Sequence, residues 1–162
     1  MLPLLIIAAT VALVVGPIML MRPTAGQQKL ARLRSRALEL DLRVHMMPLP
    51  ESVEGRRQCA AYCLPWSTDD GDAAPWLLVR GQYDHDIHFS GHWQWSDDQT
   101  APQRWHGLLM PRLAELPESV VAVGNGPQGL CVYWRERGPE RQLERLAEWL
   151  KLLREARLSG GH

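Results

Sequence analysis

Cysteine is scarce in this chain, glycine and proline are unremarkable, and neither sign of charge is in excess. The 162 residues include 3 Cys, 13 Gly and 12 Pro, with 18 basic against 18 acidic side chains. Three cysteines are too few for a disulfide scaffold, and the glycine and proline content is too low for a collagen-like or disordered chain. A dedicated nucleic-acid binder normally carries a basic excess. We therefore expect one globular domain and no nucleic-acid partner.

Charge is also missing from the beginning of the chain. Between Leu2 and Met21 there is no charged side chain and no Asn, Gln or His. A helix of 20 residues is about 30 Å long, which matches the hydrocarbon core of a bilayer. No Lys or Arg precedes this run and no small-x-small cleavage site follows it directly, in contrast to a secretory signal. We predict that residues 1–21 form an uncleaved transmembrane anchor.

Basic side chains follow that apolar run and predict its orientation. Residues 22–43 hold six basic and two acidic side chains, whereas 44–162 hold twelve and sixteen. By the positive-inside rule, the chain is a single-pass inner-membrane protein with its N-terminus outside and its C-terminal domain cytoplasmic. An odd number of cysteines favours the same reducing compartment. The charges either only enforce this topology or also contact anionic lipids, through Arg22, Lys29, Arg32, Arg34 and Arg36.

The residues after the anchor predict an α+β fold. Apolar residues at helical spacing from Leu30 to Leu40 predict a juxtamembrane basic amphipathic helix within 22–43. Residues 44–162 are expected to form a cytoplasmic domain, an antiparallel sheet with helices packed on one face. The order helix, strand, turn, strand occurs in both 30–66 and 108–135, which suggests a duplication. The expected elements are a four-strand meander at 42–47, 59–64, 76–80 and 92–96, a helix at 105–116, a hairpin of 120–123 and 130–135, and a last helix from Pro139.

One glycine-rich stretch matches a nucleotide-binding motif. Residues 124–129 read G-x-G-x-x-G after an apolar strand, as a dinucleotide fingerprint does. That motif also needs a helix to begin there, so that its backbone amides face the pyrophosphate. The continuation from Leu130 to Trp134 is typical of a strand instead. We therefore expect a hairpin that turns at Asn125–Gly126, and no cofactor.

Imidazoles and carboxylates crowd together only between residues 83 and 92. His85, His88 and His92 lie close in sequence to Asp84 and Asp86. Three imidazoles can hold a metal ion with an open position, and an Asp can orient a His for base chemistry. However, neighbouring side chains on a loop diverge, and no nucleophile motif accompanies them. We predict a solvated loop, with no catalysis and no metal.

The cysteines offer a second set of metal ligands. Cys59 and Cys63 are four residues apart, so they share one face of a strand and could join those histidines. Zinc knuckles normally use a C-x2-C spacing, which this pair does not have. We expect both of them, and Cys131, to be buried core thiols.

Tryptophan is the most frequent aromatic residue, with seven copies. Trp93 and Trp95 are two residues apart, so they share one face of the strand expected at 92–96. Their polar neighbours suggest a surface that could bind a partner, and packing beneath the last helix is the other interpretation.

The membrane-proximal residues resemble a known family. From Val14 to Arg36, an apolar span ends in Met21-Arg22-Pro23 and is followed by Gln27-Gln28-Lys29. This pattern resembles the small accessory subunit of the bacterial preprotein translocase, which has one N-terminal span and a similar basic stretch. The resemblance covers 14–36, two or three extra residues interrupt its motif, and it implies a translocase-accessory role.

Together these features predict an inner-membrane protein whose cytoplasmic domain binds a protein partner, without catalysis. Two alternatives stay open. One is an anchored enzyme or metal-binding domain that uses His85 and His88, and the other is a module that lies on the lipid surface.

Overall fold

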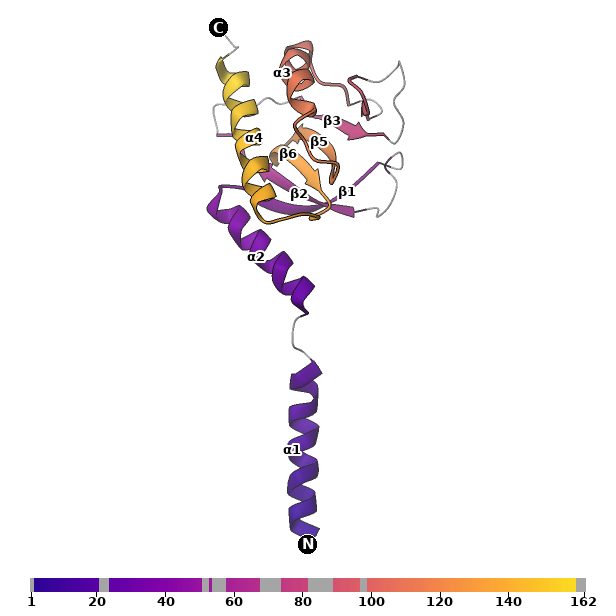
Figure 1. The fold of residues 1–162 in the computed structure, drawn as a ribbon, viewed down its shortest axis with the longest axis vertical. Helices are drawn as coiled ribbons and strands as arrows, with labels where there is room; N and C mark the ends of the chain where they lie inside the picture. The colour runs from indigo at the N-terminus through magenta and orange to yellow at the C-terminus, as the bar shows by residue number, and fades with distance from the viewer. Residues whose placement is uncertain are drawn as a thin grey trace. The chain divides into compact units, whose positions relative to one another are not determined.

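Over the residues that it describes, the computed structural model contains four helices and six strands, and it confirms the α+β class (Figure 1). It describes residues 2–20, 24–50, 53, 58–67, 74–81, 89–96 and 99–159. Contacts divide the chain into two units, 1–32 and 33–162. The elements are α1 (Leu2–Leu20), α2 (Ala25–Glu39), β1 (Arg43–Pro48), β2 (Gln58–Leu64), β3 (Trp76–Arg80), β4 (Trp93–Trp95), α3 (Gln103–Leu113), β5 (Val120–Gly126), β6 (Gly129–Trp134) and α4 (Arg141–Ser159).

The unit of residues 1–32 contains α1 and the first half of α2. Large apolar side chains of α1 are exposed, and they are Leu4, Leu5, Ile6, Ile7, Val11, Leu13 and Val15. None of the helices, as far as the structure describes their residues, combines the length and the apolar character that crossing a membrane requires.

The unit of residues 33–162 is built around one antiparallel sheet of six strands. Its strand order is β1-β2-β6-β5-β3-β4. The expected meander is wrong, because the β5–β6 hairpin lies between β2 and β3 instead of following β4. Strands that are consecutive in sequence pair often but not always, and here β2 pairs with β6, a strand from the far end of the chain.

The two αββ segments occupy adjacent parts of this sheet. The first contributes β1 and β2 and the second contributes β6 and β5, so their second strands lie side by side. In the antiparallel register between β2 and β6, Cys63 lies opposite Cys131 and Tyr62 lies opposite Val132. The central pairing of the sheet therefore joins the two segments.

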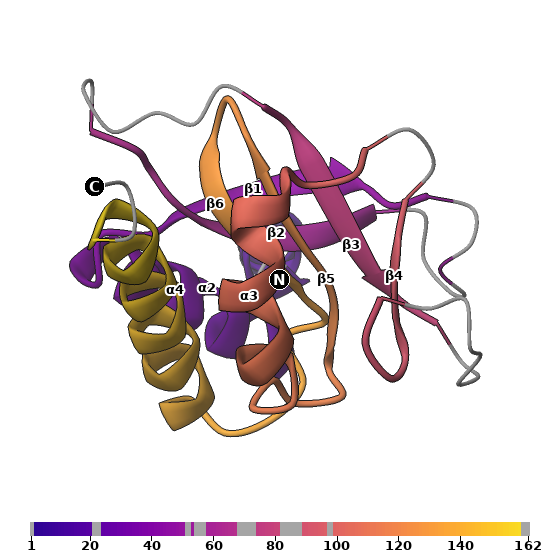
Figure 2. The same cartoon turned by 90° about the horizontal axis from the view of Figure 1, so that it is seen from above.

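Helices α3 and α4 cover one face of the sheet (Figure 2). Tyr62, Trp76 and Trp134 point to this face and are almost completely buried. From α4, Leu143, Leu146, Leu150 and Leu153 form the buried stripe that their spacing predicts. Helices on one face of an antiparallel sheet are thus confirmed.

The opposite face of the sheet is also apolar and buried in the middle strands. Val53, from the connection between β1 and β2, packs on it together with the partly buried Met47, Leu49 and Leu77. Because both faces are buried, β2, β5 and β6 are continuous apolar runs rather than alternating ones. The buried residues of the strands on this face are Cys59, Ala61, Cys63, Val79, Val121, Ala122, Cys131 and Tyr133.

The second half of α2, from residue 33, belongs to the α+β unit, whereas this domain was expected to begin at residue 44. Arg34 Nε and Nη2 donate hydrogen bonds to the two carboxylate oxygens of Glu136 at 3.2 and 3.3 Å. The Tyr62 hydroxyl donates to the same carboxylate at 2.9 Å. Burial first, and then the Glu136 charge, raise the pKa of Tyr62 above its ordinary value. Arg34 thus joins α2 to the ends of β2 and β6.

Candidate functional site: a groove beside α4

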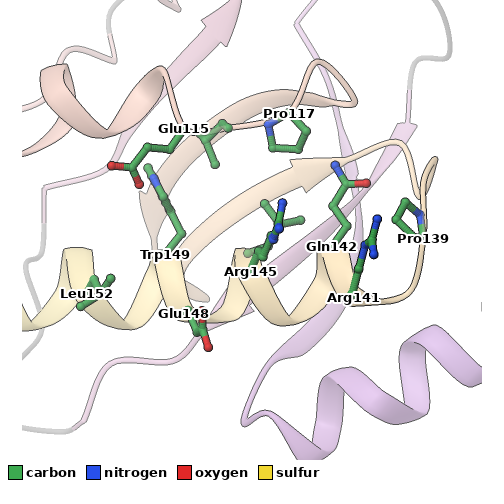
Figure 3. Close-up of a pocket in the computed structure, with 11 residues that line it drawn as sticks. Glu115, Pro117, Pro139, Arg141, Gln142, Arg145, Glu148, Trp149 and Leu152 are labelled. Carbon is green, nitrogen blue, oxygen red and sulfur yellow. The ribbon is translucent and has the colours of Figure 1, made fainter.

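A groove of about 450 Å³ lies between α4 and the connection from α3 to β5 (Figure 3). We call it the α4 groove. Apolar side chains from both walls line it, and charged side chains of both signs stand among them. The lining residues are Glu115, Leu116, Pro117, Pro139, Arg141, Gln142, Arg145, Leu146, Glu148, Trp149 and Leu152.

The apolar part of the groove extends the buried stripe of α4 toward solvent. Leu146 is buried in the core and Trp149 is 5% exposed, whereas Leu152 is 55% exposed. On an α-helix, residues three and four apart are neighbours, so these side chains form a continuous apolar strip. Burying an exposed leucine against a partner gives roughly 1.5–3 kcal/mol. Leu152 therefore offers binding energy that the isolated domain does not use.

Hydrogen bonds from the interior fix the wall opposite α4. Arg80 of β3 donates to the carbonyl oxygens of Pro117 and Leu116 at 2.9 and 3.1 Å. The indole Nε1 of Trp149 donates to the Arg112 carbonyl at 3.0 Å. Desolvation lowers the pKa of Arg80, and the Glu118 charge opposes that effect. Both walls are therefore held in place before any partner binds, which reduces the entropy lost on binding.

The charged residues of the groove have no ionic partner within the described part of the chain. Among the residues that the structure describes, no ion pair or side-chain hydrogen bond involves Glu115, Arg141, Arg145 or Glu148, and all four are exposed. By contrast, Glu144 on the same helix is paired with Arg36, with Nη2 and Oε1 3.0 Å apart. An apolar floor with charged side chains at its rim resembles the arrangement of many protein–protein interfaces.

The histidine-rich loop lies almost wholly outside the described residues. This applies to His85, His88, Asp84 and Asp86. His92 is described and exposed, and its carbonyl oxygen accepts a hydrogen bond from the Gly81 amide at 2.7 Å. Within the described ranges no three His, Cys, Asp or Glu residues are grouped as metal ligands would be.

Trp93 and Trp95 share a strand face, as predicted, but that face points to the helices. Trp93 is only 4% exposed, and the Arg80 guanidinium lies 4.7 Å from its ring centre. Trp95 packs against Phe89 at 4.8 Å and Trp76 at 6.0 Å between ring centres. Trp93 is therefore packed within the domain, where it supports the arginine that holds the groove wall.

The basic residues expected to touch lipid divide between the two units. Arg22 lies outside the described residues, while Lys29 and Arg32 are exposed on α2. Arg34 and Arg36 form ion pairs with Glu136 and Glu144 inside the α+β unit. Two of these five basic residues thus form ion pairs within the α+β unit.

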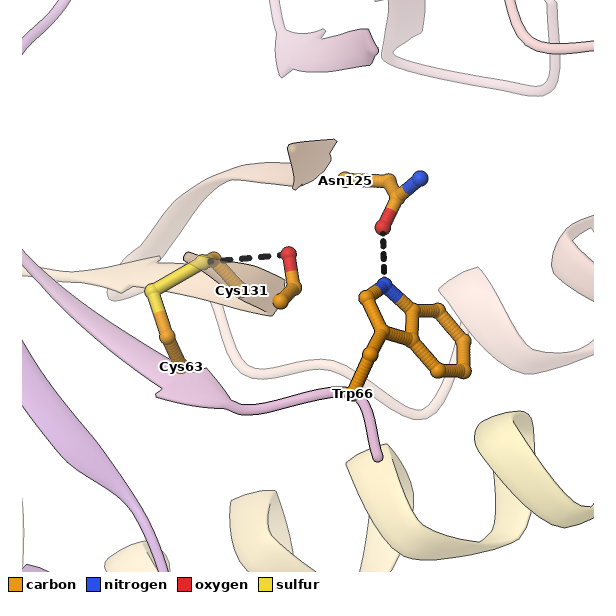
Figure 4. The surroundings of a disulfide bond; sticks show 5 residues. Cys63, Trp66, Asn125 and Cys131 are labelled. Atoms are coloured by element: carbon orange, nitrogen blue, oxygen red, sulfur yellow. Dashed lines mark hydrogen bonds between the residues drawn. A yellow bond between two sulfur atoms is a disulfide. The ribbon is translucent and has the colours of Figure 1, made fainter. Parts of the chain in front are cut away.

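The expectation of three core thiols is wrong for two of them. Cys63 and Cys131 form a disulfide across β2 and β6 with their Cα atoms 4.0 Å apart (Figure 4). Directly opposed residues of antiparallel strands are close enough to be bridged. These two cysteines are opposed only because β2 pairs with β6, and they are 68 positions apart in the sequence. Cys59 is buried and carries a free thiol, as expected.

Burial raises the pKa of the Cys59 thiol to about 11. Because the unfolded thiol ionises above pH 9.0 and the folded thiol only near pH 11, the folded state is favoured less as the pH rises from 9.0 toward 11. Below pH 9.0 this contribution to stability is fully present. Between pH 8 and 10.5 we expect the free energy of unfolding of the native chain to fall. This fall should exceed that of the Cys59→Ala variant by about 1–2 kcal/mol. Urea unfolding followed by tryptophan fluorescence measures it, and equal losses in the two proteins would contradict it.

The G-x-G-x-x-G stretch forms a hairpin, as predicted, because strand β6 and not a helix follows it. The turn, however, lies two residues later than expected. Gly126 pairs with Gly129 across Pro127 and Gln128, and Asn125 is a buried strand residue. Its side chain accepts a hydrogen bond from Trp66 Nε1 at 2.7 Å and donates to the Ala74 carbonyl at 3.1 Å, as Figure 4 shows for Trp66.

The groove residues were missed from the sequence, although one signal pointed to them. Trp149 and Leu152 lie outside the stripe of leucines at 143, 146, 150 and 153. They widen the apolar surface of α4 beyond what one core-facing stripe needs. The opposite wall is supplied by residues 115–117, which no spacing rule connects to α4.

Comparison of the chain with known protein families, with curated proteins and with solved structures gives no significant match.

Proposed function

We propose that this chain is a single-pass membrane protein whose α+β domain binds another protein through the α4 groove. The observation that carries this proposal is the groove itself, an apolar floor with unpaired charges on walls that are already fixed. Its volume suits a few side chains of a peptide segment rather than a large flat surface. Its lining combines apolar side chains with Arg and Glu, a composition that suits recognition by contact and charge.

The anchor part of the proposal rests on the printed sequence from Leu2 to Met21. This uncharged run is longer than the part of α1 whose side chains are described. The described α1 side chains are apolar and exposed, with Leu4 at 76% and Leu13 at 77%. Exposed apolar surface of that extent is unfavourable in water and is covered by lipid in an anchor. The resemblance of residues 14–36 to the translocase accessory subunit agrees with an anchor and does not reach the α+β domain.

We propose that the domain faces the cytoplasm. The positive-inside rule acts during insertion, when the basic segment at 22–43 is not yet folded, so later ion pairs of Arg34 and Arg36 do not weaken it. The Cys63–Cys131 disulfide is atypical of that compartment, where thiols are mostly kept reduced. A C-terminal reporter active only outside the cytoplasm would contradict this orientation.

Site-specific photo-cross-linking tests the binding function in native membranes. With the photoreactive residue at Leu152, in the groove, we expect adducts with one defined protein. The matched position is Leu38, which is 67% exposed on α2 and outside the groove, and it should give none. Arg145→Glu should reduce the Leu152 adduct at least about fivefold, whereas Arg43→Glu, an exposed arginine on β1, should leave it unchanged. No adduct at Leu152, or one that also forms at Leu38, would refute the proposal.

A further inference from the structure

We infer that the α4 groove selects a peptide segment with an acidic side chain followed, three or four residues later, by a large apolar one. This inference rests on the proposed binding function and adds the chemistry of the partner. Its basis is the order in which charges and apolar side chains follow one another along α4.

The acidic preference comes from Arg141 and Arg145. Both line the groove and are exposed, and they lie one helical turn apart, so their guanidinium groups face the same side of α4. Neither forms an ion pair with any described residue. A carboxylate placed between the two guanidinium groups would accept charge-assisted hydrogen bonds from both.

The apolar preference comes from the next two turns of the helix. The bound carboxylate lies between Arg141 and Arg145, level with residue 143, so Trp149 and Leu152 follow it by about 9 and 14 Å along the helix axis. An extended peptide advances about 3.3 Å per residue. A segment lying along the groove would therefore reach Trp149 or Leu152 with the third or fourth residue after its acidic side chain.

The far end of the groove fixes the direction of the segment. Figure 3 shows Glu115 of the opposite wall beside Trp149, whereas the Glu148 carboxylate points away from both. The Glu115 carboxylate repels an acidic residue there and favours a basic residue next to the apolar one. A segment with its charges exchanged would place like charges together at both ends.

Fluorescence anisotropy with two synthetic nine-residue peptides tests this preference on the full chain in detergent micelles. The first peptide carries Asp, then Leu three residues later and Lys directly after it. The second has Asp and Lys exchanged. We expect the first peptide to bind at least about tenfold more tightly. Arg145→Glu should remove or invert this preference, whereas Arg43→Glu should preserve it.

Equal binding of both peptides, or binding of neither, would overturn the inference. So would a preference that Arg145→Glu leaves intact, since the acidic side chain would then not be read by that arginine. A specific adduct at Leu152 together with any of these results would refute the partner chemistry alone. Loss of that adduct refutes the binding function as well, so the two failures are distinguishable.

Discussion

Replacing Gly129 with alanine is expected to lower the free energy of unfolding by more than about 3 kcal/mol. Gly129 has φ +110°, a conformation that side chains with a Cβ rarely adopt. A Cβ built there would lie 2.2 Å from the Leu64 carbonyl oxygen and 2.8 Å from Pro65 Cα. These are backbone atoms at the end of β2, so the central pair of strands would have to separate. Urea unfolding of the full chain in micelles measures the loss.

Gly126 provides the matched control for that change. It faces Gly129 across the same two-residue turn, has an ordinary φ, and a Cβ there would meet nothing within 4 Å. Gly126→Ala should therefore change the stability by less than about 1 kcal/mol. If the two alanine variants were equally stable, the close approach of the hairpin to β2 would be wrong.

Breaking the Cys63–Cys131 bond should have the second large effect. The bond closes a loop of 68 residues, and the loss of loop-closure entropy corresponds to about 4 kcal/mol. We expect dithiothreitol to lower the free energy of unfolding of the native chain by up to this amount. The double variant Cys63→Ala with Cys131→Ala should be equally unstable with and without the reductant.

Cys59→Ala is the control for that experiment, because Cys59 is buried on the same face of β2 but is not bonded. This variant should retain the full response to dithiothreitol. A native chain whose stability does not respond to reductant would show that the two thiols are not joined. An unchanged response in the double variant would assign the effect to something other than this bond.

Most local elements could be predicted because their signals are local. The strand at Trp76–Arg80 was predicted at its observed bounds, and the other strands and α3 within about three residues. A run of β-branched or aromatic residues bounded by prolines and glycines favours a strand through local preferences alone. The turn after Asn125 was misplaced, because burial of its side chain against Trp66 and Ala74 outweighed the usual preference of Asn-Gly for turns.

Long-range contacts could not be predicted in this way. Nothing near β2 in the sequence indicates that β6, about 70 residues later, lies beside it. The same pairing decides which cysteines are bonded. Trp93 illustrates the consequence for the site, since its polar neighbours suggested a surface while β3 and the helices bury it.

The sequence by itself determined the uncharged run from Leu2 to Met21, the α+β class and the leucine stripe of α4, because each depends on residue type at a fixed local spacing. Tertiary structure alone decided the strand order, the disulfide and the α4 groove. The groove forms where residues 115–117 meet α4, held by Arg80 from a third element. Such a site depends on which distant surfaces are packed together, and a one-dimensional pattern does not encode that directly.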